Sequence, residues 1–415
     1  MGNATFYDYS ATKNNPAWEK LISRQSQLYS RGDDIRSPFA RDYTRVLHSM
    51  AYRRLKHKTQ VFFNIDNDHI CTRMEHVSHV DSVSSTIAKE LGLNDELTKA
   101  IAIAHDLGHA PFGHQGEQVI KKISKQYLNQ DFWHEKNGLR FVDKIELLED
   151  NYKVKRNLDL TYAVRDGIIS HCGEVDQNGL HPRDISIPVD DFDEPGKYQA
   201  ATWEGCVVKM ADKIAYVGRD IEDAITLGIL DQTDQNELVK MARVHDQKAV
   251  NTTVIMHNMI IDICQNSSPE NGIRLSPEFN AQLKEIKDFN YKHIYRHPRL
   301  NPYIQYSELV INQLFEILLS LYDGKHTWDG LSSNKRFAPT LSSSFELWLA
   351  KYCCPDIVPT GKLKSEALSC ENEKIYHELE TKEIYIQAII DYISGMTDRF
   401  AITAFNELLQ FGVHG

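Results

Sequence analysis

Apolar residues recur along this chain every three or four positions, and this spacing places them on one face of an α-helix. Residues 77–92 show the pattern, and Gly92 closes it as a residue that readily adopts the left-handed conformation of a helix end. The next such segment, 95–108, ends in a glycine and can be capped by Asn94 or Asp95. The dominance of this period predicts a mainly helical fold.

Residues 203–228 predict a long buried helix with an interruption near Gly218. Further helical segments are expected at residues 119–128, 135–149, 158–171, 233–244, 246–264, 305–322, 342–352 and, in pieces, 374–412. Strand-like alternation is rare, and only residues 61–73 suggest a short β-hairpin, which would turn at Asp66 and Asn67. We therefore predict an all-α fold with this one hairpin.

No internal repeat or low-complexity tract divides the chain. We expect an N-terminal extension at 1–35, a core at 36–230 and a C-terminal helical region at 231–415 that packs on the core. Residues 172–198 are rich in proline, glycine and aspartate and interrupt the helical pattern. A segment of this kind is often a lid or an interface arm, and the alternative is a disordered surface insertion.

Charge is unevenly distributed along the chain. The 415 residues carry a net charge of −11, which argues against a general nucleic-acid binder. Basic side chains nevertheless gather between Arg36 and Lys58, where the only acid is Asp42. A local positive field of this kind suits a compact anionic ligand, and the alternative is a solvated helix face.

Three further features of the sequence indicate in which cellular compartment the protein is located. The seven cysteines include no CxxC pair, which suggests free thiols in a reducing cytoplasm. No apolar run approaches the roughly 18 residues of a membrane span. The first residues lack the basic start and the apolar stretch of a secretory signal. We expect a cytoplasmic protein with no membrane association.

The stretch IAIAHDLGHAPFGHQGE, residues 101–117, brings histidines and an aspartate into one short turn. These residues either form a polar helix end or hold a metal ion. His105 and Asp106 are adjacent, so both can face one ion only near a helix end. His76 and Asp212 are the expected further ligands, since a carboxylate inside an apolar helix needs a partner. Two imidazoles and two carboxylates suit Mn, Fe, Ni or Zn, and Mg less well.

The ordered set of His76, His105-Asp106 and Asp212 resembles the H…HD…D pattern of the HD-domain metal-dependent phosphohydrolases. Collinear blocks resemble more closely the deoxyguanosine triphosphohydrolase-like family, which includes bacterial dGTPases, broader dNTPases and the vertebrate enzyme with fused SAM and HD domains. These blocks lie at residues 36–62, 73–80, 104–117, 132–140 and 211–224. The resemblance implies an HD-domain helical core with additional C-terminal helices.

The resemblance implies metal-dependent hydrolysis of deoxynucleoside triphosphates, dGTP or several dNTPs, to the deoxynucleoside and inorganic triphosphate. One divalent metal ion (Mn, Mg, Fe, Ni or Zn) would activate water and polarise the phosphoryl group. His114 matches the general acid for the leaving 5′ oxygen, and Glu117 is placed to orient it and raise its pKa. His109 and His134 match further histidines of the family that contact phosphate.

Substrate contacts also follow from the resemblance. Arg73 and Lys213 match phosphate-binding residues, and Gln60 matches a contact to the sugar or base. Tyr216 matches a tyrosine that stacks under the sugar, and Asp220 matches an aspartate that binds the 3′ hydroxyl. This chain reads ADKIAY where many bacterial members read ADDIAY, so strict dGTP specificity is not expected.

Assembly and regulation are expected on the same basis. Members of the family form homo-oligomers, so a hexamer or tetramer is expected, with a second dNTP as an allosteric activator. Two alternatives remain open. One is an HD nucleotidase or phosphodiesterase acting on other phosphate esters. The other is a regulatory protein that binds single-stranded nucleic acid weakly through residues 36–58.

Overall fold

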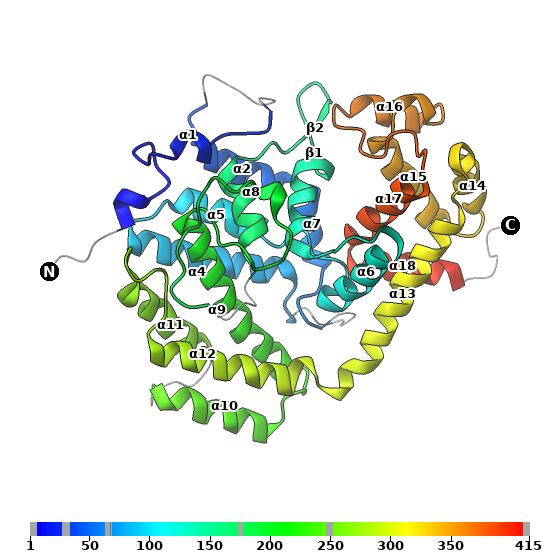
Figure 1. Ribbon diagram of the computed structural model, residues 1–415. Coiled ribbons are helices and arrows are strands. Elements are labelled where there is room, and N and C mark those ends of the chain that lie inside the picture. Colours follow the sequence, from blue (N-terminus) through cyan, green and yellow to red (C-terminus); the bar gives the residue numbers. More distant parts are fainter. Residues whose placement is uncertain are drawn as a thin grey trace. The chain divides into compact units, whose positions relative to one another are not determined.

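A computed structural model of the chain describes residues 6–26, 34–62, 67, 69–172, 177–245 and 252–409. This part of the chain is helical except for one antiparallel pair of short strands (Figure 1), which confirms the all-α prediction. The described residues form two compact units. The first falls within 1–47, 60–106 and 159–301, and the second within 48–59, 107–158 and 302–415. The predicted boundaries near residues 35 and 230 do not coincide with these limits, and the three-part division stays a prediction.

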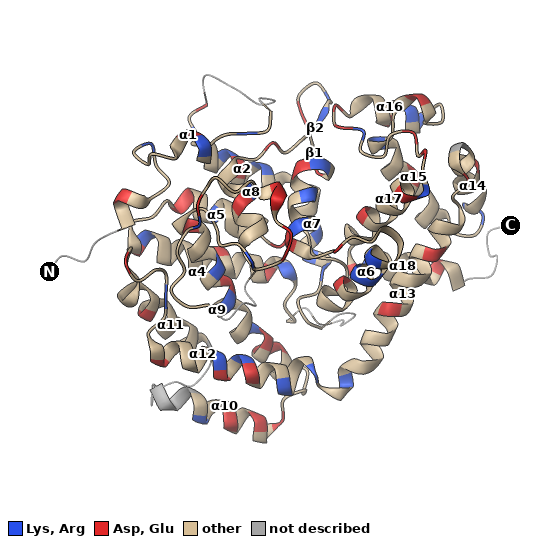
Figure 2. Ribbon diagram, in the orientation of Figure 1, with Lys and Arg blue, Asp and Glu red and all other residues tan. Residues whose placement is uncertain are grey.

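The first unit is built around one long helix, α9. Its elements are η1 (Phe6–Tyr9), α1 (Trp18–Leu21), α2 (Pro38–His48), α4 (Arg73–Leu91), α5 (Asp95–Ala104), α8 (Tyr162–Ser170), η4 (Val189–Asp191), α9 (Trp203–Thr226), α10 (Gln232–His245), α11 (Thr252–Asn266), α12 (Pro277–Asn290), η5 (Tyr291–Tyr295) and η6 (Pro298–Leu300). Helices α4, α5, α8, α11 and α12 all contact α9. Helices α10 and α12 contact each other and carry both signs of charge (Figure 2), as solvated helices do.

Local sequence explains how the helices that carry the candidate site begin and end. Thr72 and Glu75 form a capping box at the start of α4, and Gly92 ends that helix with a φ of 77°. The Asn94 side chain accepts hydrogen bonds from the first backbone N–H groups of α5. The Thr202 hydroxyl accepts one from Gly205 and so begins α9. These caps therefore determine where α4 begins and ends and where α5 and α9 begin.

The second unit contains the strand pair and most of the C-terminal helices. Its elements are α3 (Met50–Arg54), η2 (Leu55–His57), α6 (Gly113–Leu128), α7 (His134–Arg140), η3 (Phe141–Ile145), β1 (Leu147–Glu149), β2 (Lys155–Asn157), α13 (Asn301–Ser320), η7 (Gly324–His326), α14 (Thr327–Asn334), α15 (Pro339–Tyr352), η8 (Pro355–Ile357), α16 (Lys362–Ser369), α17 (Lys382–Ser394) and α18 (Asp398–Leu409). Helix α17 packs against α6, and α15 contacts α14, α16, α17 and α18. The core includes the fully buried Phe315, Phe345, Tyr376 and Tyr385.

Several predicted helices differ in extent from the observed ones. Helix α9 runs without a break through Gly218, so the predicted interruption is wrong. A Cβ at Gly218 would lie 2.7 Å from the Met256 sulfur, so this glycine allows α11 to approach closely. The predicted helix at 135–149 is divided into α7, the π-helical η3 and strand β1. The turn of the hairpin predicted at 61–73 lies outside the described residues, and the strand pair that the structure describes lies at 147–157.

The proline-rich segment between α8 and α9 is anchored in its described part. Arg183 forms an ion pair with the fully buried Asp166 of α8, and Asp166 also accepts a hydrogen bond from the Ala201 backbone at 2.6 Å. Leu180 exchanges two backbone hydrogen bonds of 2.9 Å with Ile273. These contacts tie residues 177–202 to α8 and to the segment between α11 and α12.

Candidate metal centre and histidine cluster

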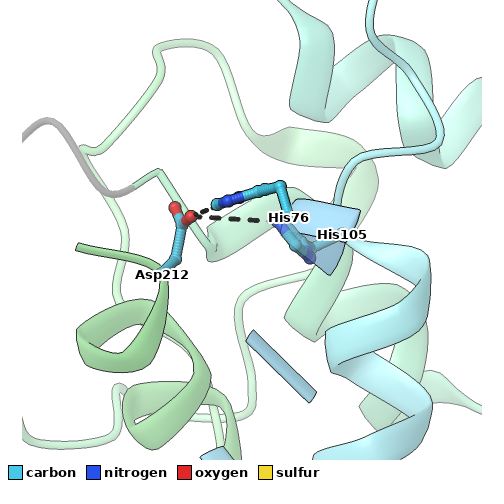
Figure 3. A group of neighbouring side chains, drawn as sticks. All are labelled: His76, His105 and Asp212. Atoms are coloured by element: carbon cyan, nitrogen blue, oxygen red, sulfur yellow. Dashed lines mark hydrogen bonds and ion pairs between the residues drawn. The ribbon is translucent and has the colours of Figure 1, made fainter. Parts of the chain in front are cut away.

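Three of the predicted metal ligands come together in the first unit. His76 lies in the first turn of α4, His105 directly follows the last residue of α5, and Asp212 lies in the middle of α9. Figure 3 shows the Asp212 carboxylate facing the imidazoles of both His76 and His105. Its Oδ1 lies 3.0 Å from His76 Nε2 and 3.9 Å from His105 Nε2. The potential ligand atoms all lie within 4.8 Å of one another, a separation that one bound cation can bridge.

Asp106 completes the group. Its carboxylate lies 3.3 Å from His105 Nε2 and 3.8 Å from His76 Nε2. Adjacent side chains of a continuous helix diverge by about 100°. Helix α5 ends at Ala104, and residues 105–108 form a turn, so the prediction that this helix extends to Gly108 is wrong. The early end of the helix lets His105 and Asp106 face the same point.

The protonation of His105 tests whether these residues suit a cation. Its Nδ1 lies 2.6 Å from the Ala102 carbonyl oxygen, so Nδ1 carries a proton, and Nε2 is the nitrogen left to bind a second proton or a metal ion. Nε2 is buried, has no hydrogen-bond partner among the described residues and faces two carboxylates. A ring nitrogen in this position requires a positive charge between itself and the carboxylates, which a proton or a metal ion can supply. The donor set therefore fits a divalent metal ion.

The pKa values of His76 and Asp212 are both shifted by the contacts between the imidazoles and the carboxylates of this group. Burial opposes the protonation of His76, but the hydrogen bond to Asp212 and the charges of Asp106 and Asp212 outweigh burial and raise its pKa. Burial also disfavours the Asp212 carboxylate, but its hydrogen bond to His76 and the charges of His105 and His76 lower its pKa. A bound metal ion would replace the shared proton, so metal binding and proton release are coupled.

Arg73 lies one turn before His76 on α4. Its side chain is buried, and one guanidinium nitrogen donates a 2.9 Å hydrogen bond to Asp106. The other two guanidinium nitrogens have no partner among the described residues. A buried guanidinium with unsatisfied N–H groups favours an anion beside the metal centre. This arrangement is compatible with the predicted phosphate contact.

The helix that carries Asp212 also presents two buried lysines. Lys213 donates a 3.1 Å hydrogen bond to the Gln177 backbone oxygen, and Lys209 donates one of 3.1 Å to the Gln199 side chain. The predicted phosphate ligand Lys213 is thus already engaged by the segment that precedes α9. Sequence reasoning did not select Lys209.

The predicted sugar-binding residues follow along α9. Tyr216 is half-buried, whereas Asp220 is buried and accepts a 2.5 Å hydrogen bond from the Tyr295 hydroxyl. Burial raises the pKa of Asp220 to about 6, although the hydrogen bond from Tyr295 opposes this shift. Sequence reasoning did not select Tyr295, because only the packing of η5 against α9 brings it to Asp220. Gln60 is buried, and its Oε1 has no partner among the described residues.

His171 is a further residue that sequence reasoning did not select. It is buried at the end of α8, and its Nδ1 lies 2.6 Å from the Ile168 carbonyl oxygen, which repeats the arrangement at His105. The two rings lie 4.9 Å apart. Its potential ligand atom lies within 4.8 Å of those of His105 and Asp106. No spacing rule connects His171 with His105, because only the packing of α8 on α5 brings them together.

The remaining predicted catalytic residues form a cluster in the second unit. Glu117 accepts hydrogen bonds from the His134 backbone N–H at 2.9 Å and from its Nδ1 at 3.2 Å. Its carboxylate lies 3.7 Å from His114 Nδ1, and the rings of His109 and His134 lie 3.9 Å apart. Glu117 therefore contacts both histidines, with the shorter distances to His134 rather than to the predicted partner His114.

Charge and exposure differ within this histidine cluster. Burial disfavours the Glu117 carboxylate, but the charge and hydrogen bond of His134, the contact with His114 and the charge of His109 lower its pKa well below the usual range. The side chain of His114 is 55% exposed, whereas Glu117 is buried. An exposed imidazole beside a fixed carboxylate is suited to exchange protons with a bound molecule.

Glycines shape the turn that leads into α6. A Cβ at Gly108 would lie 2.1 Å from the backbone of Gly138 and His134, and the Asn137 side chain donates a 2.7 Å hydrogen bond to the Gly108 carbonyl oxygen. Only glycine permits α7, which carries His134, to approach the turn this closely.

The basic segment 36–58 is largely occupied by contacts within the protein. Arg36 and Arg41 pair with Asp34, Arg45 donates to the Asp159 carbonyl oxygen, Arg54 pairs with Glu146, and Lys58 is buried. Arg53 and Lys56 are exposed. The segment therefore offers less accessible positive charge than its composition suggests. Binding of single-stranded nucleic acid stays a prediction.

A buried histidine and aspartate centre on a helical core defines the class of this protein as an HD-type phosphohydrolase. Residues 73–217 match the HD domain family, and residues 273–326 and 364–407 match the phosphohydrolase-associated domain. The HD match contains all four predicted metal ligands and the histidine cluster.

Similar proteins narrow the class. A deoxyguanosinetriphosphate triphosphohydrolase-like protein from Desulfatibacillum aliphaticivorans is 31% identical over 90% of this chain and 88% of its own length. Proteins of the same description from Clostridium tetani and Caldanaerobacter subterraneus subsp. tengcongensis are 30% and 31% identical over 91% and 93% of this chain, and 86% and 90% of their own lengths. The chain belongs to the deoxyguanosinetriphosphate triphosphohydrolase-like family of HD-domain phosphohydrolases.

Proposed function

We propose that the protein hydrolyses deoxynucleoside triphosphates to deoxynucleosides and inorganic triphosphate. The observation that carries the proposal is the convergence of His76, His105, Asp106 and Asp212, with the buried Nε2 of His105 facing two carboxylates. The names of the similar proteins supply the substrate class. This chemistry needs an activated water and a stabilised leaving group, and the described residues can provide for both.

The four ligands would hold one divalent metal ion, and Mn, Fe, Ni and Zn suit this donor set better than Mg. When bound, the ion would lower the pKa of water and polarise a phosphoryl oxygen. The hydrogen bond from His105 Nδ1 to Ala102 fixes the ring, so that Nε2 keeps its orientation toward the ion.

Phosphate binding is assigned to Arg73 and Lys213. Arg73 is held against Asp106, and its remaining N–H groups can bind phosphate oxygens in a bidentate manner. Lys213 would exchange the Gln177 carbonyl oxygen for a phosphate oxygen when substrate binds. The gain is that a neutral acceptor is replaced by a charged one, which forms an ion pair with the lysine in a buried site.

Proton transfer to the 5′ oxygen is assigned to His114. Glu117 stays ionised because its pKa is low, and its negative charge stabilises the imidazolium form of a neighbouring histidine. Asp106 belongs to the metal centre, and His109 belongs to the histidine cluster. Because the two are three residues apart, the covalent chain itself keeps their Cα atoms within about 11 Å of each other. His109 and His134 would contact the phosphates.

Recognition of the sugar is assigned to Tyr216 and Asp220, with Gln60 at the sugar or base. The hydroxyl of Tyr295 orients the Asp220 carboxylate, which can then accept a hydrogen bond from the 3′ hydroxyl. A tyrosine packed against the sugar would leave little room for a 2′ hydroxyl.

The test is to incubate the protein with each of the four dNTPs, singly and in pairs, in the presence of Mn²⁺ or Mg²⁺. Inorganic triphosphate and deoxynucleoside are the expected products, and pairs are included because a second dNTP could be an activator. A His105→Ala variant should lose the activity and bind Mn²⁺ more weakly. Pyrophosphate or single phosphates as products would instead support a different phosphohydrolase reaction.

Assembly and location rest on less direct support. A homo-oligomer, a hexamer or tetramer, stays a prediction that light scattering can check. The seven cysteines are free, which favours a cytoplasmic location. No helix within the described residues has the length and apolar character that a membrane span requires.

A further inference from the structure

The turn that precedes α6 contains an unusual backbone conformation. Phe112 has a φ of 64°, in the left-handed region that side chains other than those of glycine and asparagine rarely adopt. It is buried and directly precedes the first residue of α6, the helix that carries His114 and Glu117 in its first turns. Such a conformation persists only where the surrounding structure holds it.

A carboxylate from the last described helix supplies part of that support. Asp398 is the first residue of α18, and its side chain is buried. One carboxylate oxygen accepts a 2.9 Å hydrogen bond from the Phe112 backbone N–H, and the other accepts one of 3.0 Å from the Thr59 backbone N–H. A single acid thus fixes two segments that are far apart in the sequence.

A buried ammonium group holds the other side of the same turn. Lys58 donates a hydrogen bond to the His109 carbonyl oxygen and a second one, of 3.0 Å, to the Ser394 carbonyl oxygen at the end of α17. Its side chain is buried. Burial raises the pKa of Asp398, and the two backbone hydrogen bonds and the charge of Lys58 oppose that shift. The turn from His109 to Phe112 is therefore bound to α18 directly at Phe112, and to the end of α17 through Lys58 at His109.

We propose that Asp398 and Lys58 act together as positioning residues, which hold the turn 109–113 so that His109 and His114 face a bound phosphate ester. This inference rests on the proposed function. Residue 398 lies in the phosphohydrolase-associated region. The proposal therefore means that this region helps to position the histidine cluster. Neither residue is expected to touch the substrate.

The chemistry of each side chain determines the best substitutions. An asparagine at 398 has one oxygen and cannot accept both backbone hydrogen bonds, and its amide group would oppose one N–H donor. A methionine at 58 keeps the apolar stem of lysine but donates to neither carbonyl oxygen. We call the hydrogen bonds of Asp398 and Lys58 to this turn the clamp. Asp398→Asn and Lys58→Met therefore remove the clamp with little change in side-chain volume. Glu346→Gln is the matched control, because Glu346 is also buried in the second unit but pairs with Lys335 instead.

Steady-state kinetics on the full-length protein give the first measurement. We expect Asp398→Asn and Lys58→Met each to lower kcat by about tenfold to 100-fold, as misplacement of a reacting group does, while KM and Mn²⁺ affinity stay close to wild type. Because the two residues hold one turn, the double variant should be no slower than the slower single variant. Glu346→Gln should keep kcat. The proposal would be overturned if the fold-reductions in kcat of the two single variants multiplied in the double variant. It would also be overturned if Glu346→Gln lowered kcat by as much.

Backbone amide exchange gives a second measurement that does not depend on activity. The Phe112 and Thr59 amides should exchange faster in Asp398→Asn than in wild type or in Glu346→Gln, in metal-free protein. Unchanged exchange would overturn the clamp even if activity fell. Faster exchange in a protein whose wild type hydrolyses no dNTP would sustain the clamp and refute the proposed function. If Asp398→Asn does not fold, Lys58→Arg, which keeps the charge and the donors, should retain more activity than Lys58→Met.

Discussion

His105 and His171 show how a single backbone contact prepares a histidine for metal binding. Each lies just beyond the end of a helix, and each has Nδ1 2.6 Å from the carbonyl oxygen three residues earlier. That contact places the ring proton on Nδ1 and leaves Nε2 as the basic nitrogen. The same local geometry occurs twice, on two helices that pack together. His171 is therefore a candidate for the ligand group even though it lies outside the HD motif.

Replacement of His171 by glutamine should weaken the binding of Mn²⁺ by about tenfold to 100-fold, the range found when groups around a metal centre are altered. The reason is that an amide lacks the basic nitrogen that imidazole presents toward His105 and Asp106. Isothermal titration with Mn²⁺ gives the affinity. His79→Gln is a suitable control, because His79 lies one turn after His76 but outside the ligand group. An affinity equal to that of the control would remove His171 from the site.

Asp220 should make stability depend on pH. Burial raises its pKa in the folded state to about 6, from the ordinary value of 3.8. The folded protein therefore binds this proton more tightly than the unfolded chain. The resulting stabilisation is present below about pH 4 and is lost as the pH rises through about 6.

The variant Asp220→Asn does not ionise, so it should gain stability relative to wild type as the pH is raised. The gain between pH 4 and pH 7.5 should approach about 3 kcal/mol, which is the linkage value for a shift of this size. Urea unfolding of the two proteins at several pH values measures it. A constant difference across this range would show that the carboxyl group titrates normally.

At the scale of elements, the segment between α8 and α9 depends on one buried ion pair. Asp166 of α8 binds Arg183 and the Ala201 backbone, and so connects both halves of the segment to a helix of the first unit. The same segment provides Gln177 and Gln199, the acceptors for Lys213 and Lys209. Its attachment therefore influences how the lysines of α9 are engaged.

Asp166→Asn should release this segment. Removal of one partner from a buried ion pair costs about 3–5 kcal/mol, because the other charge is left buried. Limited proteolysis should then cut within residues 177–202 faster than in wild type. Asp190→Asn provides the comparison, since Asp190 is 71% exposed and lies 3.7 Å from Arg165. Equal cutting rates in the two variants would mean that Asp166 does not anchor the segment.

Helices were predictable where their sequence signals are local. Gly92 and Asn94 end and begin α4 and α5 as expected, because caps depend only on neighbouring residues. Gly218 does not break α9, because its role depends on Met256 of another helix. Helix α6 begins at Gly113 rather than near 119, since its start follows from the left-handed Phe112. Where local sequence signals did not determine the extent of a helix, packing against other helices did.

The same division holds for the candidate site. His76, His105, Asp106 and Asp212 could be selected because residue type, order and spacing form a known pattern. Tyr295, His171 and Asp398 could not, because each reaches its partner only through the packing of helices that are distant in the sequence. A motif identifies the ligands of a site, and tertiary structure is needed to find the residues that orient them.

At the scale of the whole molecule, the two units do not follow one another along the chain. Each is assembled from separate stretches, and the change from the first unit to the second falls between Asp106 and Leu107, inside the HD turn. The predicted division into a catalytic core and a C-terminal region treats these parts as successive. Within the second unit, the hydrogen bond from Phe112 to Asp398 spans 286 positions of sequence.

That long-range hydrogen bond limits how far the reading frame can be shortened. A nonsense mutation ahead of codon 398 would leave every residue of the HD motif in the product, yet Phe112 would lose the acceptor that secures its strained backbone. A shortened version assembled from the motif-bearing stretch alone would meet the same difficulty.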